Sequence, residues 1–521
     1  MGVLQKIKLC NFKRFQTLEA RFSPDLNVLI GDNESGKSSI LLAVDLTLGG
    51  SRTRVETLGL ESLFNSAAIE AFLESDRRIE DLPLLSVELY LDEQNDPDLN
   101  GTNNSEGRAC DGVQLVCSPN YLVSADIAAI LADDSSAFPF EYYEVTFNTF
   151  SGKPYAAYNR PVRHVHIDSA HINNEYATRE YIKDLYLAHV QGTEKSKHSN
   201  EYRRHKESFQ ADVLRELNDR VERYDFVLRT TGKATLESDL TIAEEGIAIQ
   251  NKGRGQQCFI KTAFALNRSR SSAPIDILLM EEPENHLSHV NMKRLIGMIR
   301  ERTEKQLVIA THNSLISTRL DLRKCLLLNS NNTAVALLDN LTEDTALFFM
   351  KAPSSNVLEF ILSQRVILVE GDAEYILAEA FFKKITGHAS EDSNTHIISV
   401  GGTSFKRYLE LAVLLDIKTA VVRDNDGNYQ QNCVEGFAEY TGANIQVFSE
   451  SDNEKRTFEI SLYAQNAPVC DALFAASRRT LTVQEYMLGN KAEAAFALLL
   501  HKADELEPPR YFADAIAWIR E

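Results

Sequence analysis

The sequence predicts an α/β fold in more than one domain. Several short apolar runs end abruptly in polar residues, as buried parallel strands do. Helical stretches separate some of these runs, which is the order of elements in proteins whose parallel strands are joined by crossover helices. The chain has 521 residues, which is too many for one hydrophobic core, so two or three domains are expected.

The first domain begins with strand, strand, phosphate loop and helix over residues 3–48. Residues 84–91 (LLSVELYL) predict a further strand, and the polar stretch that starts at Glu93 predicts a long surface loop. The pattern stays strand-rich but less regular to about residue 170. We therefore assign residues 1–170 to the N-terminal part of the first domain.

A helical block follows, over residues 171–225. Phe209, Val213, Leu217 and Val221 recur at four-residue steps with charged residues between them, which predicts an amphipathic helix. We interpret the block as an insertion or dimerisation element. It also holds a basic run that is either a local nucleic-acid contact or, as is commoner for charge runs, a solvated helix face: Lys195, Lys197, Arg203, Arg204 and Lys206.

Strand patterns return at residues 273–287 and 305–314, so residues 226–350 are assigned to the C-terminal part of the first domain. A domain boundary is expected near residues 350–363. Beyond it, three strand ends with helical stretches between them predict a second, smaller α/β domain over residues 363–521.

Composition excludes several classes of protein. Hydrophobic residues make up 44% and charged residues 25% of the chain, as in ordinary globular proteins. No window reaches eighteen consecutive apolar residues, so we expect a cytoplasmic protein with no membrane partner. The seven cysteines lack the paired spacings of zinc or redox sites. A net charge of -20 argues against DNA binding by global charge, so any DNA contact must be local.

The first chemical motif is a phosphate loop. Residues 31–38 match G-x-x-x-x-G-K-S/T, with a predicted strand before it and a predicted helix after it. Backbone N–H groups of such a loop turn onto phosphate oxygens, and the helix N-terminus adds positive potential. Lys37 would reach the β and γ phosphates of ATP, and the Ser38 hydroxyl would bind Mg²⁺. The cofactor-binding positions predicted here are Gly31, Asn33, Gly36, Lys37, Ser38 and Ser39.

Two further strand ends add polar groups to this site. Glu281 could hold Mg²⁺ through water, and Glu282 could orient or deprotonate the attacking water. The alternative is a pair of solvent-exposed glutamates. His312 follows the next strand and could contact the γ phosphate. A glycine-rich segment before a predicted helix could donate to a nucleotide held by another subunit: Gly253, Gly255 and Gln256.

In this order, the phosphate loop, the glycine-rich segment, EEPENHL and ATHNS resemble the ABC-type ATPase heads of the RecF and SMC relatives. Glu281 stands where many such enzymes carry Asp, and either carboxylate can serve. The resemblance implies that ATP is sandwiched between two heads. The chain would then be at least a dimer when ATP is bound.

Acidic residues at later strand ends predict a second site. Glu370 ends one strand and Glu374 lies one helical turn beyond it, while Asp424 and Asp426 follow another strand and would point the same way in extended backbone. Carboxylates about 4 Å apart repel by about 4 kcal/mol at an effective dielectric near 20, and bound cations reverse that repulsion. Oxygen ligands favour Mg²⁺ or Mn²⁺, and two ions could stabilise the attacking and leaving oxygens of a phosphodiester. The alternative is that these residues cap helices and turns.

A Glu at one strand end and D-x-D at another resemble the pattern of a Toprim domain. Only this resemblance gives roles to Glu459, which would complete the metal shell, and to Lys491, which would neutralise a scissile phosphate. The catalytic residues expected over both sites are Glu282, His312, Glu370, Asp424, Asp426 and Lys491. The metal ligands expected over both sites are Ser38, Glu281, Glu370, Glu374, Asp424, Asp426 and Glu459.

The whole order is similar to the OLD (overcoming lysogenization defect) family of nucleases. This resemblance implies an ABC/RecF-like P-loop ATPase head with a helical insertion, followed by a Rossmann-like Toprim domain. It also implies a homo-oligomer, often a dimer held by the helical insertion, that cuts or nicks DNA with a divalent metal while ATP regulates it. Family members act in phage defence, alone or beside a helicase-like or reverse-transcriptase (retron) partner.

Two alternatives remain open. The chain could be a RecF/SMC-like DNA-repair ATPase that uses the Toprim fold as a binding module, although such a module has no need of the full carboxylate set. It could also be a topoisomerase or primase. Both of these would need further catalytic apparatus, for which this chain leaves little length.

Overall fold

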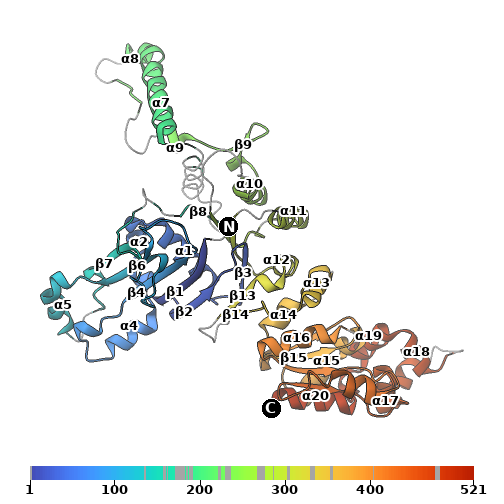
Figure 1. Ribbon diagram of the computed structural model, residues 1–521. Helices are drawn as coiled ribbons and strands as arrows, with labels where there is room; N and C mark the ends of the chain where they lie inside the picture. Colours follow the sequence, from blue (N-terminus) through green and yellow to red (C-terminus); the bar gives the residue numbers. More distant parts are fainter. Residues whose placement is uncertain are drawn as a thin grey trace. The chain divides into compact units, whose positions relative to one another are not determined.

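The computed structural model is shown in Figure 1, and within the described residues each of its two units contains a hydrophobic core. The chain divides into unit 1, Met1–Ile316 with Lys324–Val335, and unit 2, Ser317–Arg323 with Ala336–Glu521. The domain limits expected at residues 170, 225 and 350–363 stay predictions. The structure describes residues 3–133, 137–156, 160, 162–169, 182, 186, 190, 192–220, 225–228, 236–266, 276–285, 287–301, 305–328, 335–352, 356–402, 404–475 and 481–521.

An antiparallel sheet forms the first half of unit 1. Its strands run in the order β2-β1-β4-β6-β5, with β7 paired to β6. Buried and exposed positions alternate along β2 and β7, so one face of the sheet packs on the core. The strands are β1 (Leu4–Phe12), β2 (Phe15–Arg21), β4 (Leu85–Leu91), β5 (Asn100–Gly101), β6 (Cys110–Pro119) and β7 (Tyr143–Thr149).

A second sheet of unit 1 has the order β14-β13-β3-β12-β11-β8, and β13, β3, β12, β11 and β8 pair in parallel. β12 is buried along its whole length and β11 nearly so, as parallel strands covered on both faces are. The carboxyl ends of these parallel strands therefore meet at one edge. The strands are β3 (Leu26–Gly31), β8 (His164–Asp168), β11 (Ile277–Glu281), β12 (Gln306–Ala310), β13 (Cys325–Leu328) and β14 (Val335–Leu337).

Helices cover these sheets, and α1 (Lys37–Gly49) packs against both of them. A two-stranded ribbon, β9 (Ala243–Glu244) with β10 (Ile247–Ala248), precedes α10. The other helices of this part of the chain are α2 (Arg52–Leu58), α3 (Leu60–Leu63), α4 (Ser66–Leu73), α5 (Ser124–Leu131), α7 (Gly192–Asp212), α8 (Arg215–Asn218), α9 (Leu236–Asp239), α10 (Arg254–Leu266), α11 (His289–Arg300) and α12 (Ser314–Arg319).

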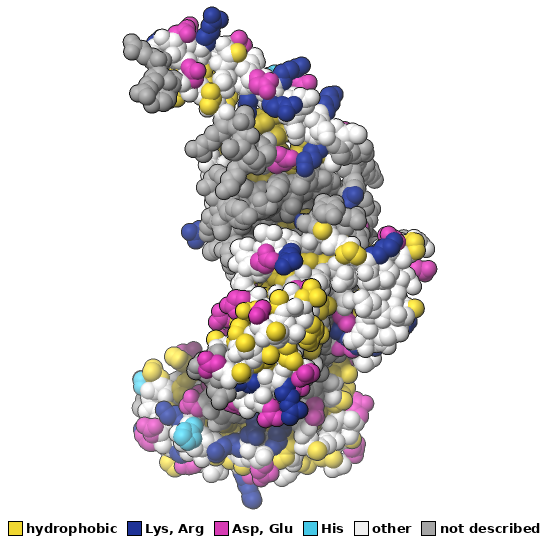
Figure 2. Space-filling model, turned by 90° about the vertical axis from the view of Figure 1, so that its left-hand side faces the viewer, with side chains coloured by type: hydrophobic (Ala, Val, Ile, Leu, Met, Phe, Trp, Pro, Cys, Tyr) yellow, Lys and Arg dark blue, Asp and Glu magenta, His cyan; other side chains and the backbone are white. Residues whose placement is uncertain are grey.

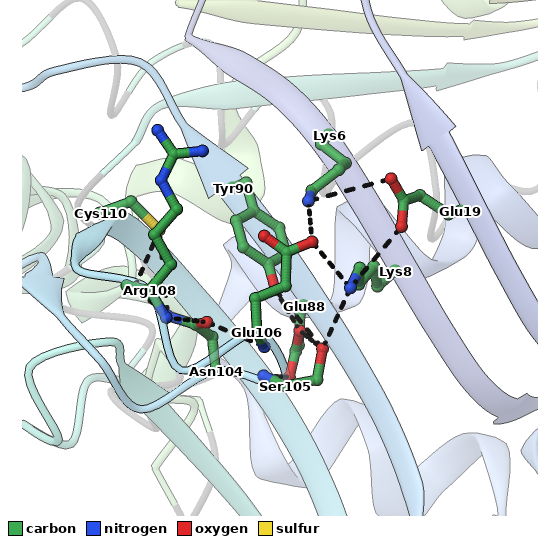
Figure 3. Close-up of polar contacts among 10 residues, drawn as sticks. All are labelled: Lys6, Lys8, Glu19, Glu88, Tyr90, Asn104, Ser105, Glu106, Arg108 and Cys110. Atoms are coloured by element: carbon green, nitrogen blue, oxygen red, sulfur yellow. Dashed lines mark hydrogen bonds and ion pairs between the residues drawn. The ribbon is translucent and has the colours of Figure 1, made fainter.

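The surface loop predicted from Glu93 is held down at its tip, as Figure 3 shows. Glu106 forms ion pairs with Lys6 and Lys8 of β1, the second at 2.8 Å between Nζ and Oε1. The neighbouring Ser105 donates its N–H and its hydroxyl to buried Glu88 of β4, each at 2.7 Å. We call these five residues the Glu106 clasp. The clasp ties the loop to two strands of the antiparallel sheet.

The predicted helical block contains α7 and α8. The single amphipathic helix expected to run on from Phe209 is wrong, because α7 ends at Asp212 and Leu217 belongs to the separate helix α8. Phe209, Val213 and Leu217 are 47%, 55% and 40% exposed, and Val221 lies outside the described residues. Figure 2 shows basic side chains beside acidic ones on this arm, at the top of the view. Three members of the basic run have acidic partners within 4 Å, as expected for a solvated helix face: Lys195 with Glu237, Arg204 with Glu201 and Lys206 with Asp239.

Unit 2 contains a four-stranded parallel sheet in the order β16-β15-β17-β18, with helices packed on it. α20 packs on β15, β17 and β18, and α15 packs against α19 and β16. The strands are β15 (Arg365–Val369), β16 (Thr395–Ser399), β17 (Lys418–Val422) and β18 (Ile445–Phe448). The helices are α13 (Glu343–Lys351), α14 (Val357–Leu362), α15 (Asp372–Thr386), α16 (Phe405–Leu415), α17 (Phe458–Phe474), α18 (Val483–Gly489), α19 (Lys491–Lys502) and α20 (Arg510–Arg520).

All seven cysteines are free thiols, and five of them are buried. In the ranges that the structure describes, none of the helices combines the length and apolar character that a membrane crossing requires.

Candidate functional site

The phosphate loop connects β3 to α1, and its glycines are required by packing. Gly36 precedes α1 with φ of 99°, a conformation that disfavours residues with a Cβ. A Cβ there would lie 2.3 Å from the Phe15 ring, and a Cβ on Gly31 would lie 2.3 Å from the Leu328 carbonyl oxygen. The loop therefore keeps its tight path only with glycine at both positions.

Lys37 is buried and folds back on its own loop. Its ammonium donates to the carbonyl oxygens of Gly31 and Asp32, both at 2.8 Å, and to the Ser35 hydroxyl at 3.3 Å. Burial lowers the pKa of Lys37 to about 8, although nearby carboxylates led by Glu282 raise it. A phosphate group would offer this ammonium stronger acceptors than backbone carbonyls.

The two glutamates at the end of β11 diverge at a sharp turn. Glu282 has φ of 44°, and its N–H donates to the Ala310 carbonyl at 2.8 Å. Ser169 donates its hydroxyl to the carbonyls of both glutamates. Burial raises the pKa of Glu281, and a hydrogen bond from the Ser38 hydroxyl opposes that rise.

His312 lies on the Glu282 side of the site. His312 Nε2 is 3.4 Å from Glu282 Oε1, and the Asn285 amide donates to the other oxygen of Glu282 at 2.6 Å. Burial and then the charge of Lys37 lower the pKa of His312. The structure thus brings together five of the predicted groups: Lys37, Ser38, Glu281, Glu282 and His312.

The remaining predicted nucleotide residues lie at the edges of this site. Asn33 is exposed in the loop and Ser39 is half-buried in the first turn of α1. Gly253 immediately precedes α10, and Gly255 and Gln256 lie in its first turn. Their predicted ligand is held by another subunit, so their role stays a prediction.

Sequence reasoning missed several polar groups near the phosphate loop. Asp168 ends β8 directly beside Glu281 and contributes to the raised pKa of that residue. Glu284 accepts from the Thr311 hydroxyl at 2.5 Å, and Arg14 donates to a loop carbonyl, that of Glu34. Asp168 carried a usable signal, since it is the polar residue that ends a strand pattern. Glu284 and Arg14 carried none.

In unit 2, the residues at the ends of β15 and β17 line a cavity of about 390 Å³. Acidic groups from three elements enter it, together with one ammonium from α19. α15 and α19 pack together, which brings their first turns to the same opening. The lining residues are Glu370, Gly371, Asp372, Ala373, Glu374, Gly401, Gly402, Asp424, Lys491 and Ala492.

The carboxylates of this cavity repel one another in a buried place. Burial, reinforced by Glu374 and Glu370, raises the pKa of Asp424 to about 8. Burial, reinforced by Glu459 and Glu370, raises the pKa of Glu374 to about 7. Burial also raises the pKa of Glu370, whose Oε2 accepts the Asp424 N–H at 3.2 Å.

Glu459 and Lys491 form an ion pair beside the cavity. Lys491 Nζ lies 3.0 Å from Glu459 Oε2. Glu459 is almost completely buried, and within the described ranges its two carboxylate oxygens accept no hydrogen bond beyond this ion pair. The pKa of Lys491 is raised, because Glu459 and the other carboxylates outweigh the effect of burial.

Asp426 does not line the cavity. β17 ends at Val422, and Asp426 has φ of 49°, so the extended backbone assumed for the D-x-D pair does not continue. The Asp426 carboxylate lies 3.1 Å from an Arg423 nitrogen and is half exposed. The structure therefore gathers Glu370, Glu374 and Asp424, and it places Asp426 outside them.

The donor set suits a divalent cation. No three His, Cys, Asp or Glu side chains of the described ranges already surround one point at metal-binding distance. Buried carboxylates that lie close together nevertheless need a cation or a proton to offset their repulsion. Hard oxygen donors fit Mg²⁺ or Mn²⁺. Glu370, Glu374 and Asp424 could hold such an ion, with Glu459 released from Lys491.

Comparisons with known proteins cover both units. Residues 26–318 match the family described as AAA domain, putative AbiEii toxin, Type IV TA system. Residues 361–426 match the family described as Overcoming lysogenization defect protein-like, TOPRIM domain. The chain is 26% identical over 169 residues to the Old nuclease of Escherichia phage P2. That match covers 30% of this chain and 29% of the relative, so it spans less than a third of the relative's length.

Two solved structures are also similar. The C-terminal region of the Burkholderia pseudomallei OLD protein is 19% identical, with a TM-score of 0.26, and covers 30% of this chain and 97% of that one. An SMC head bound to the C-winged helix domain of ScpA is 16% identical, with a TM-score of 0.35, and covers 66% of this chain and 100% of that one.

Proposed function

The chain belongs to the family described as AAA domain, putative AbiEii toxin, Type IV TA system, and is an OLD-family ATPase–Toprim protein; from this premise we propose that it is a metal-dependent DNA endonuclease regulated by ATP. One observation carries the proposal: Glu370, Glu374 and Asp424 meet in one cavity beside the ammonium of Lys491. A binding module has no need of so unfavourable a cluster of buried carboxylates.

The residues of the cavity have separate tasks in this proposal. Glu370, Glu374, Asp424 and Glu459 bind Mg²⁺ or Mn²⁺, and Asp426 joins them by turning away from Arg423. When bound there, such ions would supply an activated water and would stabilise the attacking and leaving oxygens of the phosphodiester. Lys491 holds the negative charge of the scissile phosphate. Because Asp424 and Glu374 have raised pKa values, each must release its proton before it binds a cation.

The nucleotide site regulates this chemistry. Lys37 binds the β and γ phosphates of ATP, and Ser38 and Glu281 hold its Mg²⁺. Glu282 and His312 orient the attacking water and contact the γ phosphate. ATP held between two copies of the chain then sets access of DNA to the cavity. We place the protein in anti-phage defence, as a homo-oligomer, alone or with a helicase-like or reverse-transcriptase partner.

Cleavage of supercoiled plasmid by the purified chain tests the proposal, with Mg²⁺ or Mn²⁺ and with or without ATP. Asp424→Asn should reduce nicking at least 100-fold, and Asp426→Asn shows whether the second aspartate joins the metal site. Lys37→Ala should make the rate independent of ATP. Asp416→Asn, at an exposed turn of the same unit, is the matched control and should cut normally.

Two outcomes would reject parts of the proposal. Nicking that survives Asp424→Asn would exclude this cavity as the nuclease site. ATP hydrolysis without cleavage of any DNA would favour the RecF/SMC-like ATPase in which the Toprim fold only binds.

A further inference from the structure

Asp45 is a buried acidic residue of α1, the helix that begins at the phosphate loop. Its carboxylate lies 2.9 Å from His164 Nε2 and 3.2 Å from His166 Nδ1, and it also pairs with Arg54. A buried carboxylate is costly unless it is paired and hydrogen-bonded. Three partners satisfy this one, and the two histidines come from the neighbouring strand β8.

The two histidines differ in the surroundings of the ring nitrogen that does not contact Asp45. His166 Nε2 is buried without a hydrogen-bond partner in the described structure, and it lies 3.9 Å from Glu281 Oε2. His164 Nδ1 is also buried, but within the same ranges His164 forms an ion pair with Asp45 only. Only His166 therefore stands between two carboxylates.

The strand register explains this arrangement. β8 and β11 pair in parallel, with His166 opposite Leu279 and Asp168 opposite Glu281. Residues two apart in a strand point to the same face, so the side chains of His166 and Glu281 are diagonal neighbours. His164 lies two residues further from the carboxyl ends of the strands, which takes it away from Glu281.

We propose that His166 is a positioning residue of the nucleotide site: Asp45 holds its ring, and the ring holds the Glu281 carboxylate toward Ser38. The inference rests on the proposed function, in which Ser38 and Glu281 serve the same Mg²⁺. Ser38 and Asp45 belong to α1, and Glu281 belongs to β11. One imidazole therefore fixes the position of the helix relative to the strand at the place where both would bind the cation. Outer partners of this kind raise metal affinity about 10-fold to 100-fold.

Amide substitutions separate the two nitrogens of His166. The side-chain nitrogen of Asn takes roughly the place of imidazole Nδ1, and that of Gln the place of Nε2. His166→Asn keeps a donor for Asp45 and removes the nitrogen that faces Glu281, whereas His166→Gln does the reverse. His164→Asn is the matched control, because it removes a donor from the same Asp45 without touching Glu281. His164→Gln keeps that donor and controls for the substitution itself.

The measurement is the affinity of the full chain for mant-ATP, once with Mg²⁺ and once with EDTA. The dissociation constant in EDTA divided by that in Mg²⁺ reports how much the metal contributes to binding, without any catalysis. We expect His166→Asn to lower this ratio about 10-fold while changing the thermal unfolding midpoint little. We expect His166→Gln to keep the ratio and to lower the midpoint. Both His164 variants should keep the wild-type ratio.

A wild-type ratio in His166→Asn would overturn the inference, and so would an equal loss in the His164 variants, because the network would then serve folding alone. The proposed nucleotide site fails in a different way. In that case the wild-type chain would bind no mant-ATP either with Mg²⁺ or with EDTA, and the inference would fall with it.

Discussion

Asp424 and Glu374 keep their protons at a pH where exposed carboxyl groups have lost them. Their pKa values, about 8 and about 7, are raised because both groups are buried and lie close to other carboxylates. In the unfolded chain the same groups have ordinary, lower pKa values. The cavity is therefore held near charge balance by protons until a cation replaces them.

This difference predicts how stability depends on pH. Between about pH 4 and pH 8 the folded protein binds more protons at these two groups than the unfolded chain does. Their stabilising contribution is thus complete below about pH 4, falls as the pH rises above that value, and is fully lost above about pH 8. Urea unfolding in EDTA at pH 5.5 and at pH 8.5 measures this effect. The free energy of unfolding should fall less between these two pH values for Asp424→Asn than for the wild type. An equal loss in both proteins would contradict the raised pKa.

Gly36 is the clearest single-residue test of the phosphate loop. Gly36→Ala should destabilise unit 1 by about 1–3 kcal/mol, because the new methyl group meets the buried Phe15 ring. It should also abolish mant-ATP binding. Gly152→Ala is the control, since Gly152 has a similar φ of 88° with open space around it. That change should cost only backbone strain, about 1 kcal/mol, and equal unfolding curves for both variants would refute the packing argument.

At the scale of elements, strand and helix patterns predicted most of the framework. The run at residues 84–91 forms β4, and the phosphate loop stands between β3 and α1 as expected. The predicted fold class, an ATPase head with a Toprim domain, is confirmed. These features were readable because each depends on local periodicity or on a contiguous motif.

Features that depend on register or on backbone turns were not readable. Asp45 and His166 meet only because α1 packs on β8, and no local pattern encodes that contact. The D-x-D prediction assumed extended backbone, but a positive φ at Asp426 turns its side chain toward Arg423. Long-range packing and single left-handed residues thus decide details that periodicity leaves open.

The apolar stripe on the helical arm makes a prediction about assembly. Phe209 of α7, Val213 in the turn after α7 and Leu217 of α8 leave apolar surface exposed, which in a dimer a second copy would bury. Val213→Asp with Leu217→Asp should shift the sedimentation coefficient toward that of the single chain. His205→Asp, at an exposed polar position of α7, should not. Unchanged assembly in the double variant would exclude the arm as the contact.

At the scale of the whole molecule, the two units have separate hydrophobic cores and separate sites. A ligand that binds only the folded form of one unit stabilises that unit by mass action. The nucleotide and the divalent cation should therefore act on different unfolding transitions.

Scanning calorimetry can test this independence. ATP in Mg²⁺ at 100 times its Kd should stabilise unit 1 by about 2.7 kcal/mol, and Lys37→Ala should remove that effect. Mn²⁺ without nucleotide should stabilise unit 2, and Asp424→Asn should remove only that effect. If either variant abolished both shifts, the two sites would not be independent.

The Glu106 clasp predicts how readily a protease can cut the loop that it ties down. The bonds of Glu106 to Lys6 and Lys8 lower its pKa to about 2, so the clasp stays charged in any ordinary buffer. High salt weakens such partly exposed ion pairs, since the screening length falls from about 10 Å at 0.1 M to about 3 Å at 1 M. A glutamate-specific endoproteinase should therefore cut after Glu106 slowly at 0.1 M NaCl and faster at 1 M. In a Lys6→Gln, Lys8→Gln variant the cut should be fast at both salt concentrations, which would make two lysines of a neighbouring strand the guard of this loop against digestion.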